Sequence, residues 1–86
     1  MEFEFDAAKS ASNWQKHGID FVQAQALWDS PRVEVPLSHP LEERSLLIGR
    51  IDEKHWTAVI TYRGDRVRII SVRRARKGEV QAYGTE

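Results

Sequence analysis

The sequence predicts an α+β fold in which two N-terminal helices pack on a small antiparallel sheet of three to four strands, followed by a short C-terminal helix. Apolar residues recur at helical spacing over residues 7–28, which favours helices there. Residues 44–74 instead contain three runs rich in β-branched and aromatic residues, which are typical of strands. With 86 residues, the chain has the length of one domain, and we expect that domain to span residues 1–86.

The first helix is expected over residues 7–17. Asp6 is placed to cap its N-terminus, and Gly18 can supply the left-handed conformation that often ends a helix. Three residues recur on one side of this helix and form its expected buried stripe: Ala7, Ala11 and Trp14.

A second helix is expected to begin at Asp20 and to stop at Ser30 and Pro31. Asp20 and Gln23 have the spacing of a capping box, in which each side chain bonds the other residue's backbone N–H. Its expected buried stripe is Phe21, Ala24 and Trp28.

The predicted strands of the sheet are residues 44–51, 55–63 and 66–74. Residues 50–55 form the turn between the first two. Residues 3–5 alternate apolar and acidic side chains, and residues 32–35 lie among the three prolines, so each is at most an edge strand. Residues 75–84 are expected to close the chain as a short helix.

The last two strands form a hairpin whose register can be predicted. Gly64 and Asp65 suit a two-residue turn, because glycine supplies the positive φ that such turns need. The expected pairs are Arg63 with Arg66, Thr61 with Arg68, Val59 with Ile70, Thr57 with Val72, and His55 with Arg74. This register predicts one face that carries arginines, threonines and His55, and a more apolar face that meets the helices.

Charge is distributed unevenly along a chain whose formal net charge is zero. Residues 63–77 hold seven basic side chains against one acid, Asp65, a net charge of +6. Such a local field suits a polyanion, an acidic protein partner, or both. Arginine in place of lysine favours bidentate phosphate contacts. The alternative is that neighbouring carboxylates, such as those of Glu42, Glu43 or Glu79, simply pair with these arginines.

The three histidines do not have the spacing of a metal site. His17, His39 and His55 lie far apart in the sequence, with no carboxylate at ligand spacing, so we expect no metal and no other cofactor. His17 ends the first helix, where a cation is favoured by the helix dipole. His55 shares the predicted arginine face, and imidazole can transfer protons near neutral pH.

Composition points to a cytoplasmic protein. The chain has no cysteine, its N-terminus is acidic, and it lacks an apolar run of membrane-spanning length. It also lacks a glycine-rich phosphate loop. The three tryptophans, Trp14, Trp28 and Trp56, fit apolar faces and are expected in the core.

Two stretches resemble a known family when taken together. The first reads N-x-x-KHG-I-x-F-x-x-A and comprises Asn13, Lys16, His17, Gly18, Ile19, Phe21 and Ala24. The second, RIISVRRA, spans Arg68–Ala75 and is followed by Glu79 and Tyr83. Their order resembles the BrnT family, the toxin component of bacterial type II toxin–antitoxin modules, from Phe5 to Tyr83. The chain departs from many relatives at its start, where FEFD replaces a tryptophan before the aspartate.

The resemblance implies a fold similar to that of the RelE-like ribonucleases. It also implies a ribonuclease that inhibits translation and is neutralised by a BrnA-like antitoxin protein. That antitoxin carries a DNA-binding domain, so DNA would be contacted only through it.

Metal-free cleavage of RNA needs a base for the ribose 2′-OH, cations for the transition state and an acid for the leaving 5′ oxygen. We expect Arg63, Arg68 and Arg74 to hold the phosphate, with Arg73 in reserve if the register differs. The candidates for proton transfer are His55, Lys16 with His17, and Glu79. The expected RNA-binding residues are Arg44, Arg66, Arg73 and Arg76.

Two functions of other classes remain open. The chain could be a binding module whose arginines serve only an acidic protein partner. It could also be a nucleic-acid-binding regulator, although the predicted fold offers no basic recognition helix.

Overall fold

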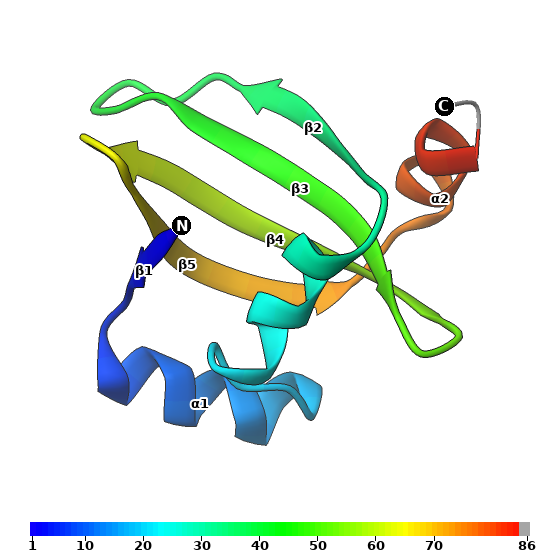
Figure 1. The fold of residues 1–86 in the computed structure, drawn as a ribbon, viewed down its shortest axis with the longest axis horizontal. Helices are drawn as coiled ribbons and strands as arrows, with labels where there is room; N and C mark the ends of the chain where they lie inside the picture. Colours follow the sequence, from blue (N-terminus) through cyan, green and yellow to red (C-terminus); the bar gives the residue numbers. More distant parts are fainter. Residues whose placement is uncertain (85–86) are drawn as a thin grey trace.

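A five-stranded mixed sheet forms the centre of the computed structural model, which describes residues 1–84 (Figure 1). The strands lie in the order β1-β5-β4-β3-β2. Their bounds are Glu2–Glu4 (β1), Arg32–Leu37 (β2), Arg44–Ile51 (β3), Lys54–Arg63 (β4) and Arg66–Arg74 (β5). β1 runs parallel to β5, whereas the other neighbouring strands within residues 1–84 are antiparallel.

The predicted sheet of three to four antiparallel strands is therefore wrong, although the α+β class is confirmed. Both stretches expected to be edge strands at most, β1 and β2, belong to the sheet and form its two edges. Alternation of side chains indicates a strand but carries no information on its direction or its neighbour. Pro36 is tolerated in β2 because a proline on an edge strand removes an N–H that can face solvent.

The helices are α1 (Ala7–His17), the 3₁₀ helix η1 (Gln23–Asp29) and α2 (Lys77–Gly84). α1 and η1 lie against one face of the sheet, whereas α2 lies apart from them near the chain's C-terminal end (Figure 1). The prediction of two N-terminal α-helices is wrong, because the second segment is a 3₁₀ helix. Its capping box does form, since the backbone N–H groups of Asp20 and Gln23 each donate to the other side chain, at 3.1 and 2.7 Å.

α1 begins and ends where the sequence predicts. The Asp6 carboxylate accepts from the Lys9 N–H at 3.1 Å, and Gly18 takes a φ of 76° as its N–H bonds the Trp14 carbonyl at 2.8 Å. Its predicted buried stripe is wrong, because Trp14 is 51% exposed and the buried residues of α1 are Ser10 and Asn13.

Two polar side chains of α1 are buried because they satisfy backbone groups of neighbouring segments. The Asn13 amide donates to the Ile19 and Val72 carbonyls at 2.8 and 2.9 Å and accepts from the Val72 N–H at 3.1 Å. The Ser10 hydroxyl accepts from the Phe21 N–H at 2.9 Å. β1 pairs with β5 only as far as Arg68. Farther along that edge, the Asn13 side chain makes the hydrogen bonds to the β5 backbone that a neighbouring strand would otherwise make.

The core lies between the sheet and the helices α1 and η1. We call the face of the sheet that these helices cover the helix face. The core residues come from η1, its preceding loop and the three long strands; among the most buried are Phe21, Ala24, Leu27, Leu47, Ala58, Ile60, Val67, Ile69 and Val72. Phe3 packs edge-on against Trp28, with ring centroids 4.9 Å apart. The opposite face of the sheet is the outer face.

The β4–β5 hairpin follows the predicted register only as far as a β-bulge. Gly64 takes the expected positive φ of 62° in the turn, and the pairs Arg63–Arg66 and Thr61–Arg68 form as predicted. A register shift between Val59 and Ile60 then leaves Ile70 as an extra residue on β5. Beyond it the pairs are Val59–Ser71, Thr57–Arg73 and Trp56–Arg74, and the three predicted pairs in this part of the hairpin are wrong.

The bulge exchanges the faces of the sheet on which two arginines stand. Because one residue changes the face that a side chain occupies, Arg73 stands opposite Thr57 on the outer face. Arg74 stands opposite Trp56 on the helix face, and its guanidinium lies 5.5 Å from the centre of the indole.

Candidate functional site

The predicted site residues on the outer face form two groups at opposite ends of the sheet. The turn-end arginines, Arg44, Arg63, Arg66 and Arg68, lie near the β4–β5 turn. The α2-end cluster, His55, Thr57, Arg73, Glu79 and Tyr83, lies where α2 meets the sheet. Half-buried side chains separate the two groups, among them Leu46, Val59 and Ser71.

Carboxylates lie beside three of the turn-end arginines. The Glu4 carboxylate lies 3.6 Å from a guanidinium nitrogen of Arg68 and 4.0 Å from one of Arg63. Arg44 donates to Glu42 at 2.8 Å, and this hydrogen bond is the main reason that the pKa of Glu42 is lowered. The alternative that carboxylates simply pair with the arginines thus holds for these three. Glu42 was among the expected partners, whereas Glu4 was not.

The α2-end cluster is centred on a bidentate ion pair. The two terminal nitrogens of Arg73 donate to the two carboxylate oxygens of Glu79, at 2.7 and 2.8 Å. The buried Thr57 hydroxyl and the Arg76 backbone N–H also donate to Glu79, at 2.9 and 2.8 Å. Glu79 therefore joins β4, β5 and the start of α2.

These contacts set the ionisation of the pair. The hydrogen bonds from Arg73 are the largest cause that lowers the pKa of Glu79 from 4.5 to about 2, and the bonds from Arg76 and Thr57 act in the same direction. The same bonds raise the pKa of Arg73. Glu79 is thus ionised at neutral pH, and it is a weak base as long as Arg73 holds it.

His55 belongs to the same end of the outer face. Its ring meets the Tyr83 ring edge-on, with centroids 5.2 Å apart, and its carbonyl accepts from the Ala75 N–H at 3.0 Å. The Tyr83 hydroxyl donates to the Pro31 carbonyl at 3.2 Å, which ties α2 to the start of β2. His55 is two residues from Thr57 in β4, or about 7 Å along the strand.

The structure does not bring all the predicted catalytic residues together. His55 and Arg63 are eight residues apart in one strand, about 26 Å, and Arg74 lies on the helix face. Lys16 and His17 lie on α1, beside the edge of β5. Of the predicted set, His55 and Glu79 lie at the same end of the outer face, and Arg73 takes the face expected for Arg74.

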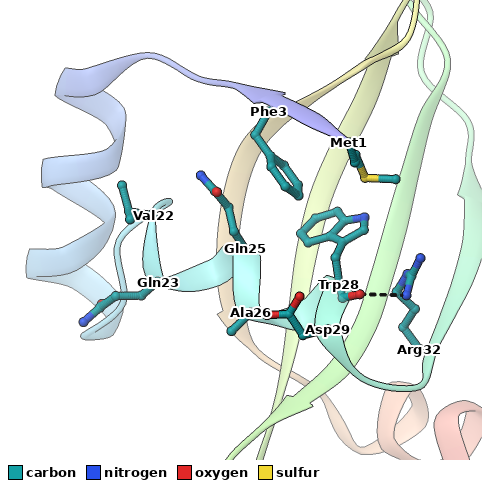
Figure 2. A pocket seen from close by; sticks show the side chains of 9 residues that line it. All are labelled: Met1, Phe3, Val22, Gln23, Gln25, Ala26, Trp28, Asp29 and Arg32. Carbon is teal, nitrogen blue, oxygen red and sulfur yellow. Dashed lines mark hydrogen bonds between the residues drawn. The ribbon is translucent and has the colours of Figure 1, made fainter.

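A hollow of about 590 Å³ on the helix side lies outside all of these groups (Figure 2). Met1, Phe3, Trp28 and Arg32 are among the residues that line it. The Arg32 guanidinium donates to the Trp28 carbonyl at 3.1 Å.

Sequence reasoning missed Glu4 and Thr57 as partners of the predicted residues. Glu4 lies 64 positions before Arg68 in the sequence, and a β-branched residue such as Thr57 in a strand is ordinary. Neither position carries a local signal, because each role depends on strand pairing. Within residues 1–84, no three His, Asp or Glu side chains gather as a metal site would require, and no helix is long and apolar enough to cross a membrane.

The structure thus places a carboxylate, a guanidinium and an imidazole at one end of the outer face of a small α+β protein. A family described as "Ribonuclease toxin, BrnT, of type II toxin-antitoxin system" matches residues 5–79. The chain belongs to this BrnT family, as its sequence motifs indicate. It is therefore a member of a family of ribonuclease toxins, which implies an antitoxin partner and an RNA target. A search of curated proteins found no match.

Proposed function

We propose that the chain is a metal-independent endoribonuclease whose reacting phosphate binds at the α2-end cluster. The observation that carries this proposal is the bidentate Arg73–Glu79 pair at the same end of the outer face as His55. The three groups supply the chemistry that cleavage through the ribose 2′-OH requires: a base, a cation for the phosphorane-like transition state and an acid for the leaving oxygen. The turn-end arginines bind the RNA strand farther along the outer face.

In this mechanism the substrate activates its own base. A phosphate that binds Arg73 competes with Glu79 for the same guanidinium nitrogens. Because those hydrogen bonds are the largest cause of the low pKa of Glu79, their loss raises that pKa toward the range of a useful base. Glu79 then accepts the 2′-OH proton, His55 protonates the 5′ oxygen, and the product carries a 2′,3′-cyclic phosphate.

Membership of a toxin–antitoxin family supports a role in such a module. In this proposal, RNA cleavage in the cytoplasm inhibits translation, and a BrnA-like antitoxin neutralises the toxin. Co-expression with the product of an adjacent reading frame should restore growth that the toxin alone arrests.

The decisive experiment measures RNA cleavage by the purified chain in the presence of EDTA. Wild type is expected to leave 2′,3′-cyclic phosphate ends, and His55→Gln to reduce the rate about 100-fold or more, the usual contribution of a general acid. His39→Gln, the same substitution in the β2–β3 loop, is the control and should retain the wild-type rate. Activity that appears only with added magnesium would reject the mechanism.

Glu79 needs a separate readout because it also anchors α2. Glu79→Gln should lose cleavage under conditions where circular dichroism shows it folded, and its residual rate should lose the acidic limb of the pH profile. A folded variant that keeps the wild-type rate and pH profile would assign Glu79 a structural role alone.

A non-catalytic binding module is the second candidate. Glu79 already accepts four hydrogen bonds, which hold α2 against the sheet. This anchoring role accounts for the Arg73–Glu79 pair without catalysis and so favours the second candidate. RNA that stays intact with wild-type protein while the antitoxin binds tightly would support this alternative.

A further inference from the structure

A basic hollow of about 300 Å³ lies where α1 runs beside the edge of β5. Lys9, Ser12, Lys16 and His17 line it from α1, and Ile70 and Ser71 line it from β5. Ile70 is the extra residue of the β-bulge, so the hollow opens where β5 departs from regular pairing. The side chains that surround it thus include three that carry or can carry positive charge, and none that is acidic.

These cations lack the partners that the sheet arginines have. Among residues 1–84, the ion pairs join Glu4, Glu42 and Glu79 to arginines of the sheet, and none involves Lys9, Lys16 or His17. Asn13 also lines the hollow, but its side-chain amide already makes hydrogen bonds to the backbone of Val72 and Ile19. The lysine charges and the hydroxyls of Ser12 and Ser71 therefore remain available to a ligand.

The spacing of the lysines suits an extended anion better than a single ion. Lys9 and Lys16 are seven residues apart in α1, which places them about 10 Å apart along the helix axis. Both flexible lysine side chains would have to bend toward one small anion, which costs side-chain entropy, whereas successive phosphates of a single strand can meet each ammonium group separately. Inorganic phosphate should therefore compete weakly at constant ionic strength.

The position of the hollow connects it with the proposed site. On β5, Ile70 and Ser71 lie between Arg68 of the turn-end arginines and Arg73 of the α2-end cluster. Ser71 is two residues from Arg73, or about 7 Å along the strand. A strand whose reacting phosphate binds Arg73 can thus cross the edge of β5 at the bulge and continue along α1.

We infer that this hollow is a phosphate-binding subsite for the single-stranded RNA that flanks the cleaved bond, with Lys9 and Lys16 holding successive phosphates and Ser12 and Ser71 donating hydrogen bonds. This inference rests on the proposed ribonuclease function and extends its substrate to a strand of several nucleotides. It assigns Lys16 and His17 to binding and leaves proton transfer to the α2-end cluster.

The test compares Lys16→Gln and Lys9→Gln/Lys16→Gln with Lys54→Gln. Lys54 is an exposed lysine at the β3–β4 turn, so its replacement removes the same charge away from the hollow. Glutamine has nearly the helix propensity of lysine, and all three variants should keep the wild-type circular dichroism and Tm. The probe is a 2′-O-methyl RNA of about ten nucleotides, which has no free 2′-OH and cannot be cut.

Binding is measured by fluorescence anisotropy over a series of salt concentrations. Each phosphate contact on a single strand contributes a slope of about 0.7 in log K against log salt, so each lost lysine should weaken binding about 5-fold at about 0.1 M salt and reduce the slope by about 0.7. Lys54→Gln should bind as wild type does. Equal affinity and slope for Lys16→Gln and Lys54→Gln would overturn the subsite.

The outcomes separate this inference from the proposed activity. If wild type cuts RNA and the lysine variants bind as well as the control does, the subsite is wrong and the activity stands. If binding depends on the lysines but wild type cuts no RNA, the activity is wrong and a nucleic-acid-binding surface remains. If the lysine variants lose affinity for the antitoxin but not for the probe, the hollow is a protein contact and the inference is overturned.

Discussion

Single polar residues hold the elements of this fold in position. Asn13 satisfies both backbone groups of Val72 and so fixes α1 against β5. Glu79 does the same for α2, which has no buried residue of its own within the described part of the chain. Both side chains act between segments that lie far apart in the sequence.

At this scale, Glu79→Gln should destabilise the protein in a way that depends on pH. The folded pKa of Glu79 is about 2, below its ordinary value of 4.5, so its stabilisation is present above about pH 4.5 and is lost as the pH falls toward 2. We expect the variant to lose about 2 kcal/mol of unfolding free energy at pH 7. Urea denaturation should show the difference between wild type and variant shrinking at pH 3.

The control for this prediction is Glu53→Gln in the exposed β3–β4 turn, which should change stability by less than about 0.5 kcal/mol at either pH. A difference between wild type and Glu79→Gln that stays constant with pH would show that packing, not charge, accounts for the loss.

The elements end where local chemistry dictates, but their burial depends on their neighbours. Asp6 and Gly18 delimit α1 as predicted, while its buried face is Ser10 and Asn13 in place of the apolar stripe. The polar face turns inward because the edge of β5 offers unpaired backbone groups there. In β5, one bulge similarly decides which arginine reaches the outer face.

Two glycines test the boundaries of the helices. Gly18→Ala should lower the unfolding free energy by about 1 kcal/mol, because alanine is strained at a φ of 76° even though a new Cβ meets nothing within 4 Å. Gly78→Ala, in the first turn of α2 and also open to space, should raise it by up to about 1 kcal/mol. Thermal denaturation should place the two Tm values on opposite sides of wild type, and equal shifts would contradict the assigned end of α1.

The whole molecule keeps a neutral net charge and yet has separate charged surfaces. The basic stretch of the sequence divides among the outer face, the helix face and the α2 end, and acids brought from β1, the β2–β3 loop and α2 pair with part of it. Among residues 1–84, the positive charge without an ion-pair partner therefore lies partly in the basic stretch, at Arg66, Arg74, Arg76 and Lys77, and partly on α1.

This distribution predicts that Glu4→Gln strengthens RNA binding. The substitution frees Arg63 and Arg68, the two arginines nearest this carboxylate, so affinity for the 2′-O-methyl RNA should rise about 5-fold at about 0.1 M salt. Glu2→Gln, on the same strand but without an ion pair among the described residues, changes the net charge equally and should have a smaller effect. Equal gains in anisotropy titrations would show that only overall charge matters.

Much of the local structure was predictable from the sequence. The ends of α1, the capping box at Asp20, the turn at Gly64 and the first two pairs of the hairpin all depend on residues within a few positions of one another. Membership of the BrnT family was likewise recognisable, because its motifs are local. That the chain is a single domain over residues 1–86 stays a prediction.

The candidate site was predictable only in part. Arg73, Glu79 and His55 were each considered, but the bulge at Ile70 decided that Arg73 and not Arg74 stands on the outer face. The sequence by itself determined which residue types were present and where α1, β3 and β5 begin. The tertiary structure alone decided which charges meet, because pairing of β1 with β5, the bulge and the docking of α2 join residues whose separation in the chain leaves no local pattern.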